Sequence, residues 1–371
     1  MNSLDQLVPL GKSMHLLSRL VLKGPHRAQE MEDEERSLKQ ELSRLPHDEF
    51  EEMIALAQSN HVIVRALEAI LTLMRGSEET SQILRAKTAL ATEKARIANV
   101  LTFLARVWAS FEERGYDVTV IKSLDHWPDF GSDLDLYTSV SPGAVISLMR
   151  QRFGAQIAPR SWGDRLAHKW NFAIAGLPEL IEIHVGRLGQ TGEQVTIASG
   201  LSTRSRAMQV GGNSFRVPSS SDRVMISTMQ RMYRHFYFRL CDVLDTCTLA
   251  EAGDLDYANL RFLARGAGIW EGVATYLAIV SDYVERYRGF GLDLPQFVTN
   301  SARIRGSEIF FKNEFLRVPI LPHSARLYGS QLAGVLAKGE LHNGVRLSLL
   351  PWLAAAAAVG YKFTGRDKGI W

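Results

Sequence analysis

Two aspartates separated by a single residue stand out as groups that could hold a cation. Asp133 and Asp135 lie in the segment Asp-Leu-Asp-Leu-Tyr at 133–137, which alternates like a β-strand. Because alternate side chains of a strand share one face, both carboxylates are expected on the same side, with Leu134 and Leu136 toward the core. Two such carboxylates repel each other unless a cation lies between them. The spacing therefore predicts a site for a hard divalent ion such as Mg²⁺, which prefers oxygen ligands.

A later segment supplies a candidate third ligand. The run Leu-Ile-Glu-Ile-His-Val at 180–185 alternates in the same way, so Glu182 and His184 share one face and the branched apolar residues share the other. Glu182 is the preferred ligand because Mg²⁺ takes oxygen donors. His184 is the alternative.

The turn before the first acid has a composition that suits phosphate oxygens. Gly131 makes the turn flexible, and Ser132 adds a hydroxyl beside backbone N–H groups. Both residues are therefore candidate phosphate contacts. Asp125 and Asp129, in the loop just upstream, share no face with the acid pair, and their replacement is expected to have little effect.

A basic strip follows the strands. Residues 203–239 contain seven arginines and one acid, Asp222, although the whole chain carries a net charge of only +3. Within an expected helix, Arg231 and Arg234 are one turn apart and could bind the phosphates of a nucleotide or an acceptor. The alternative is a salt-bridged helix face, with Asp242 as one partner. The interleaved aromatic residues could stack on a base or belong to the core.

Length and composition bound the class of protein. The 371 residues, 46% apolar and 22% charged, predict two or three packed units and exclude disordered and fibrous classes. The two cysteines, Cys241 and Cys247, cannot form a disulfide framework and are expected to be inert. His61 and His126 are interpreted as structural. The longest apolar stretch, Leu349–Tyr361, predicts a buried helix because it is too short to span a membrane. With a mean hydropathy of −0.07 and no signal-peptide pattern, a cytoplasmic protein without a membrane partner is expected.

The periodicity of apolar residues changes twice along the chain and predicts three parts. The expectation is an α+β protein: a helical region at 1–115, a small mixed-sheet α/β core at 116–217 and a helical region at 218–371. Within the core the predicted elements are, in order, strands at 116–121 and 133–137, a helix at 142–154, a hairpin of 170–175 with 180–185, and an irregular segment at 188–212. The C-terminal part is expected to begin with one helix over 224–249.

The acid motif resembles that of the nucleotidyltransferase-fold superfamily, the DNA polymerase beta-like fold. Gly-Ser-Asp-Leu-Asp-Leu at 131–136 matches that family's small-residue turn and acid pair, and Glu182 would be its third acid. The chain looks most like a bacterial branch with Lys-Gly before the acids and Asp-x-His in the third-acid strand. Lys122-Ser123 and Glu182-Ile-His184 would be the versions here, and Ser for Gly and Glu for Asp are departures. Further similarities to that branch lie at Pro218, His235 and Asp242.

The resemblance implies an Mg²⁺-dependent nucleotidyltransferase, with two ions and Mn²⁺ as a possible substitute. It would transfer a nucleoside monophosphate from an NTP such as ATP to a hydroxyl of RNA, a protein or a small molecule, and release pyrophosphate. The implied catalytic and metal-binding residues are Asp133, Asp135 and Glu182. The implied phosphate-binding residues are Lys122, Ser123, Gly131, Ser132, Arg231 and Arg234. The alternative function is an inactive binding module that uses its helical arm. The acceptor, the NTP base and the oligomeric state are left open.

Overall fold

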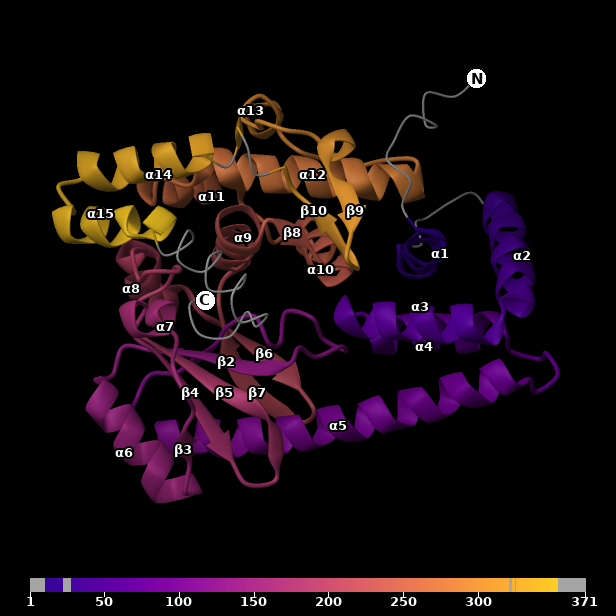
Figure 1. Ribbon diagram of the computed structural model, residues 1–371, viewed down its shortest axis with the longest axis horizontal. Helices are drawn as coiled ribbons and strands as arrows, with labels where there is room; N and C mark the ends of the chain where they lie inside the picture. The colour runs from indigo at the N-terminus through magenta and orange to yellow at the C-terminus, as the bar shows by residue number, and fades with distance from the viewer. Residues whose placement is uncertain (1–10, 23–27, 320–321, 324, 353–371) are drawn as a thin grey trace.

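The computed structural model describes residues 11–22, 28–319, 322–323 and 325–352. A five-stranded sheet lies between the long helix α5 (Ser81–Glu112) and a layer of C-terminal helices (Figure 1). The protein is therefore α+β, as the sequence predicts. The alanine run at 354–358, expected in a buried helix, lies outside the described residues.

The described residues before β1 are helical wherever they are regular. Besides α5, the helices are α1 (Lys12–Val21), α2 (Ala28–Arg44), α3 (His47–Ser59) and α4 (Ile63–Leu73). Thr80 caps α5 by accepting a hydrogen bond from the Ile83 N–H, and the helix continues for 32 residues. Ile97, Leu104, Phe111 and further apolar residues on one side of the helix are buried, whereas Leu84 is exposed. Helix α5 thus supplies one apolar wall for the sheet.

The central sheet is mixed and has the order β1-β2-β5-β4-β3. Its strands are β1 (Thr119–Val120), β2 (Asp133–Thr138), β3 (Gln156–Ile157), β4 (Lys169–Ile174) and β5 (Leu177–Val185). Strand β2 pairs with β5 in parallel, and this register places Asp135 opposite Glu182. The other pairs are antiparallel, including the β4–β5 hairpin. Helix α6 (Pro142–Phe153) follows β2, with Ser141 as its N-cap and the left-handed Gly154 at its end.

The segment 188–212 is more regular than its composition indicates. It forms helix α8 (Val195–Arg204) and strand β6 (Arg206–Val210), which pairs with β7 (Asn213–Val217). Gly211 and Gly212 both have positive φ, the backbone that a two-residue hairpin turn requires. The prediction of an irregular segment was wrong because Gly, Ser and Thr serve here as turn and helix residues around buried Ile197 and Leu201.

The single helix expected over 224–249 is interrupted. Helix α9 (Ser220–Thr228) passes into a π-helix, Met229–His235, which ends at Phe236 with φ of 54°. Strand β8 (Tyr237–Phe238) then pairs with β10 (Phe315–Arg317), which pairs with β9 (Phe310–Lys312). The C-terminal part continues with α10 (Leu240–Glu251), α11 (Tyr257–Gly266), α12 (Trp270–Arg288), α13 (Gln296–Thr299), a 3₁₀ turn at Gly306–Glu308, α14 (Ala325–Ala337) and α15 (Leu341–Ser348). Helix α7 (Trp162–Leu166) belongs to the α/β core. The C-terminal part is thus not purely helical.

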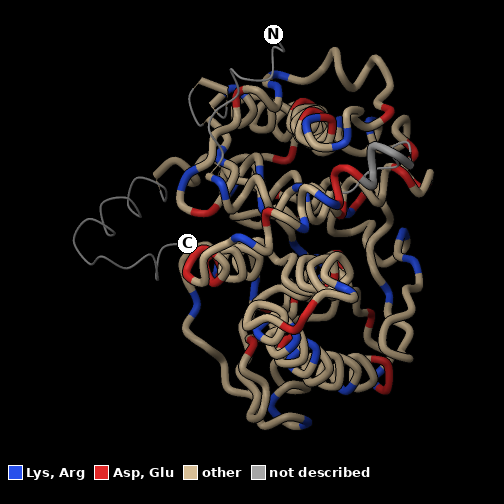
Figure 2. The backbone as a smooth tube through the Cα atoms, turned by 90° about the vertical axis from the view of Figure 1, so that its right-hand side faces the viewer, with Lys and Arg blue, Asp and Glu red and all other residues tan. Residues whose placement is uncertain are grey.

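One apolar cluster joins the three parts of the chain. It contains residues of the N-terminal helices, the sheet and the C-terminal helices, from Met14 to Leu327. Basic and acidic residues are interspersed along the backbone in Figure 2, in keeping with the small net charge. No helix in the described part of the chain is long and apolar enough to cross a membrane.

Candidate functional site

A polar cleft of about 270 Å³ opens where β2 and β5 face the π-helix. His184, the alternative third ligand, lines a neighbouring pocket, but the preferred metal ligands and all phosphate candidates of the sequence analysis line this cleft. They are Lys122, Ser123, Gly131, Ser132, Asp133, Asp135, Glu182, Arg231 and Arg234. The fold therefore brings together groups that lie up to 112 residues apart in the chain, from Lys122 to Arg234.

The three carboxylates belong to two neighbouring strands. Asp135 and Glu182 lie opposite each other, and one ligand atom from each lies within 4.8 Å of the other and of a His184 nitrogen. Burial raises the pKa of Asp133, and the charges of Asp135 and Glu182 raise it further. Ser132 Oγ donates a hydrogen bond of 3.0 Å to Asp133 Oδ2. The acids are thus close enough to repel one another, as the strand spacing predicts.

Glu182 and His184, the two candidates for the third ligand, both lie close to Asp135. His184 Nε2 lies 3.0 Å from Glu182 Oε1 and 3.7 Å from Asp135 Oδ1. The alternation along β5 puts Glu182 and His184 on one face, as expected. Glu182 keeps the oxygen donor that Mg²⁺ prefers, while His184 donates to it and orients it.

Two lysines provide the positive charge within the acid cluster. Lys122 Nζ contacts Asp135 Oδ1 and lies 3.6 Å from Glu182 Oε1. Lys169 Nζ, on β4, lies 2.6 Å from Glu182 Oε2 and 3.0 Å from Asp164 Oδ1. Burial alone would raise the pKa of Glu182, but the two ammonium groups and His184 lower it well below its usual value. Lys122 therefore pairs with the acids, where phosphate contact was expected.

The acid cluster fits a hard divalent cation. Asp135 Oδ1 is buried and receives no hydrogen bond of acceptable geometry, although the Lys122 ammonium contacts it. The Lys122 ammonium stands where a metal cation would bridge Asp135 and Glu182. A set of three carboxylates on one wall is the oxygen-rich donor set that Mg²⁺ or Mn²⁺ takes.

The serines before the acids have different roles. Ser123 Oγ donates to the Asp133 carbonyl at 3.1 Å and accepts from the Asp135 N–H at 2.7 Å. Its hydroxyl is thus committed to the backbone of β2, and the expected phosphate contact is replaced by a positioning role. Ser132 is exposed, and Gly131 lies against the His61 ring. These two residues remain available to a ligand in the cleft.

The two arginines of the π-helix also differ. Arg231 is buried, and its Nε lies 2.8 Å from Asp242 Oδ2, so the salt-bridge alternative holds for this residue. Arg234 has no carboxylate within ion-pair distance among the described residues, and its side chain lines the cleft. The sequence placed both arginines on one helix face, but the π-helix changes the spacing and sends only Arg234 into the cleft without an acid partner.

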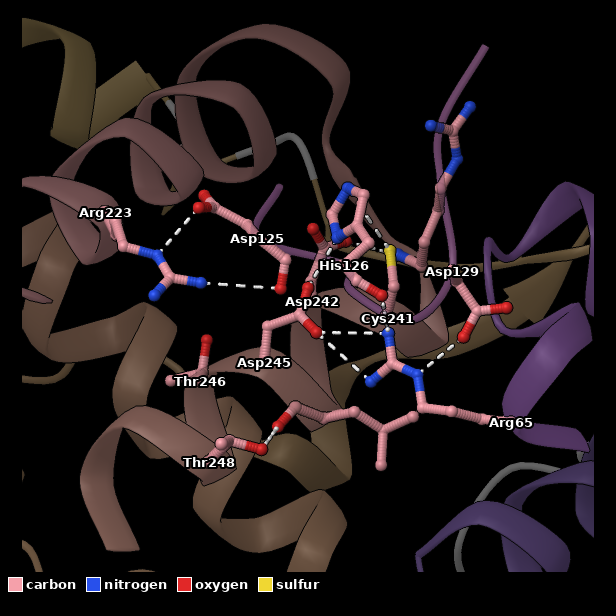
Figure 3. A network of polar contacts seen from close by, with 12 residues as sticks. Arg65, Asp125, His126, Asp129, Arg223, Cys241, Asp242, Asp245, Thr246 and Thr248 are labelled. Atoms are coloured by element: carbon pink, nitrogen blue, oxygen red, sulfur yellow. Dashed lines mark hydrogen bonds and ion pairs between the residues drawn. The ribbon is translucent and has the colours of Figure 1, made fainter. Parts of the chain in front are cut away.

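The loop acids Asp125 and Asp129, whose replacement was expected to have little effect, are both engaged in buried ion pairs. Asp125 Oδ1 lies 2.7 Å from Arg223 Nε, and both side chains are 8% exposed. Asp129 is fully buried, accepts from the Val64 N–H at 2.6 Å and pairs with Arg65 at 2.7 Å. Figure 3 shows these pairs around the start of α10. Both acids hold the loop that carries Gly131, through partners far away in the chain.

Several residues of the cleft were not singled out by sequence reasoning. Lys169 lines it, and so do His61 and His126, which were assigned only to structure. Arg239 and Tyr237 also line it, and they belong to the basic strip and the interleaved aromatic residues that were weighed as phosphate and base contacts. Alternation along β4 was a usable signal for Lys169, because counting back from the hairpin turn places it on the face of Glu182. The place of His61 and His126 at the cleft depends on tertiary contacts that no local pattern shows.

Both histidines have perturbed surroundings. Burial, with help from the charge of Arg239, lowers the pKa of His61 to about 2, which keeps the imidazole neutral. Burial also opposes the charged form of His126, but Cys241 and the Asp245 carboxylate outweigh it and raise its pKa. The polar network of Figure 3 includes His126, which lines the cleft, and His61 lies beside it with the two ring centroids 5.5 Å apart.

Comparison with known proteins does not place the chain in a family. No protein-family model matches it, and no curated protein matches it either. The function is therefore inferred from the residues and geometry of the cleft.

Proposed function

We propose that the protein is an Mg²⁺-dependent nucleotidyltransferase with a core of the DNA polymerase beta-like type. The observation that carries the proposal is the parallel pairing of β2 with β5, which sets Asp135 opposite Glu182 in a cleft that Asp133 also lines. The Gly-Ser turn at 131–132 stands at the mouth of the same strand. This combination supports the proposal because it places the acid pair and the candidate third acid in one cleft.

Asp133, Asp135 and Glu182 would hold the metal. Bound Mg²⁺ would supply charge neutralisation for the leaving pyrophosphate and acidify the acceptor hydroxyl. In the reaction a bond forms between the acceptor oxygen and the α-phosphorus, and the bond from that phosphorus to pyrophosphate breaks. The hydroxyl proton would pass to a carboxylate oxygen of the acid cluster, and Asp133, whose side chain lines the cleft, is the candidate acceptor.

The cationic wall opposite the acids would bind the triphosphate. Arg234 and Arg239 line the cleft, and neither has a carboxylate within ion-pair distance among the described residues. Guanidinium groups bind phosphate in a bidentate manner. If Asp135 and Glu182 held a divalent ion, the Lys122 ammonium would be free to contact the phosphates as well.

Transfer of label tests the proposal. Each α-labelled NTP is incubated with the protein, MgCl₂ or MnCl₂, and separate pools of RNA, protein and small molecules from a cell extract. Label is expected in one pool, and Asp133→Asn or Asp135→Asn should lower the rate by about 10²–10³-fold or more, the scale for losing one electrostatic group of a reaction centre. Asp254→Asn is the matched control because the Asp254 side chain is 53% exposed and its ion pair among the described residues is with the surface residue Arg206. Equal transfer by wild type and both site variants would refute the catalytic role.

One observation favours the alternative of a binding module. Lys122 and Lys169 already neutralise the acids, as internal cations would in a protein that does not bind metal. Thermal melting separates the two functions. A catalytic site predicts stabilisation by Mg²⁺ plus NTP of about 2.7 kcal/mol at a hundred times the dissociation constant, and a module without a nucleotide site predicts no change.

A further inference from the structure

A second cluster of metal-ligating side chains lies at the cleft, built from residues that the acid site does not use. One ligand atom each from His61, His126 and Cys241 lies within 4.8 Å of the other two. His126 Nε2 is 3.9 Å from Cys241 Sγ, and the two imidazole rings are 5.5 Å apart between centroids. We propose that these three residues bind a zinc ion, separately from the carboxylates and independently of the proposed function.

The donor set selects the class of metal. Two imidazoles and one thiolate are the borderline-soft ligands that Zn²⁺ takes, whereas Mg²⁺ avoids sulfur. Three protein ligands leave a fourth tetrahedral position. His61 and His126 line the cleft, so a zinc ion held by them would lie at its wall, where water or an acceptor oxygen could approach it.

Contacts behind the ligands hold His126 in the orientation that a zinc ligand needs. His126 Nδ1 lies 2.5 Å from Asp245 Oδ2 and would donate its N–H to that carboxylate, which leaves Nε2, 3.9 Å from Cys241 Sγ, as the nitrogen that would bind the metal. Asp245 Oδ1 in turn accepts from Arg65 at 3.2 Å. A carboxylate behind a histidine is the usual outer-shell partner in zinc sites. Figure 3 shows Asp245, His126 and Cys241 in this order.

The turn that carries His61 is attached to the helix that carries Cys241. Asn60 is fully buried; its Oδ1 accepts from the Leu240 N–H at 3.0 Å and its carbonyl accepts from the Cys241 N–H at 3.2 Å. His61 then takes a left-handed backbone conformation, with φ of 54°. Two segments 180 residues apart are thereby fixed to each other at the cluster.

Other uses of this cluster fit the structure less well. A Cys-His-Asp nucleophile would need access to substrate, but Cys241 is fully buried. A hydrogen-bonded core cluster would satisfy its polar atoms, but His61 Nδ1 is buried with no hydrogen-bond partner among the described residues. A metal ion accounts for the convergence of all three side chains. It would join the α3–α4 turn, the loop before Gly131 and the start of α10.

Metal content and cobalt absorption test the proposal on the full chain. The protein is stripped with a chelator, then titrated with Zn²⁺ or Co²⁺ in excess Mg²⁺, which occupies the carboxylates. We expect about one zinc per chain and, with cobalt, the sulfur-to-metal charge-transfer band of a tetrahedral thiolate site. Cys241→Ser should abolish the band and weaken zinc binding at least about 10-fold, and Asp245→Asn should weaken it about 10–100-fold.

The chain offers a matched control and a separation from the acid site. Cys247 is equally buried but contacts Arg288, so Cys247→Ser should keep the band and the zinc. Asp133→Asn should keep both as well, whatever happens to nucleotide transfer. If Cys241→Ser does not fold, the cobalt spectrum of the wild-type protein still shows whether a thiolate binds the metal. Folded wild-type protein without the thiolate band, or a band that persists in folded Cys241→Ser, would overturn the proposal.

Discussion

Replacing Asp129 by asparagine should destabilise the protein strongly, although Asp129 binds no ligand in the proposed mechanism. The carboxylate is fully buried, and its two oxygens serve two partners. Oδ1 accepts from the Val64 N–H at 2.6 Å, at the first turn of α4, and Oδ2 accepts from Arg65 Nε at 2.7 Å. An asparagine keeps one acceptor and turns an NH₂ group toward the other donor, which leaves a buried N–H without a partner.

The size of the effect follows from what remains around Arg65. Breaking a buried ion pair by removing one partner costs about 3–5 kcal/mol. Because Arg65 still reaches Asp245 Oδ1 and the His126 carbonyl, we expect the lower end of that range, about 3 kcal/mol. Burial raises the pKa of Asp129 against the opposing charge of Arg65, so part of the pair's attraction already offsets desolvation.

Denaturant unfolding followed by circular dichroism measures the change. The free energy of unfolding of Asp129→Asn is compared with that of wild type and of Asp254→Asn, which alters an exposed pair and should shift it by less than about 0.5 kcal/mol. A loss below about 1 kcal/mol for Asp129→Asn, near that of an ordinary substitution, would show that the loop is not held by this carboxylate and would refute the reasoning.

Three further outcomes are expected. Asp133→Asn should leave the melting temperature equal or higher, because burial and the neighbouring acids raise the pKa of Asp133 and the charged form is disfavoured. Burial opposes the charged form of Asp117, but hydrogen bonds, chiefly from Ser139, outweigh it and lower its pKa. Its stabilisation is thus present above the unfolded pKa of about 3.9 and lost as pH falls through the folded pKa, so the urea midpoints of wild type and Asp117→Asn should differ at pH 7 and converge below about pH 4. Arg231→Gln should cost about 3–5 kcal/mol by unpairing a buried acid, whereas Arg234→Gln should weaken nucleotide binding in calorimetry without loss of stability.

Local patterns were sufficient for the acid strand and the hairpin. The alternation at 133–137 requires two faces, so it fixed which residues face the cleft, and Ser141 with Pro142 marked the following helix. The same alternation extends to Lys169, whose place on the face of Glu182 could have been read from the hairpin turn. These features depend on neighbours in sequence or across one short turn.

The remaining features depend on contacts between residues far apart in the sequence, which no local pattern predicts. The roles of Asp125 and Asp129 come from Arg223 and Arg65, which lie 98 and 64 residues away. The π-helix at 229–235 has the composition of an ordinary helix, and Tyr237 and Phe238 leave the helical path to pair with β10. Tertiary contacts override helix propensity at this point, so the burial of Arg231 could not be predicted from the spacing of residues in the sequence.

Lys122, which was expected to contact phosphate, lies in the acid cluster. The residue takes a left-handed backbone conformation with φ of 64°, which side-chain-bearing residues rarely adopt. That turn directs its ammonium between Asp135 and Glu182, where it balances charge that a divalent ion would otherwise balance. A bound ion with two charges would compete directly with the single charge of Lys122 for the same oxygens. Under the proposed function, binding of metal and release of a lysine toward phosphate would then be one event. A non-glycine residue held in this sparsely populated backbone region costs about 1–3 kcal/mol, and the exchange of Lys122 for the metal would be linked to that cost.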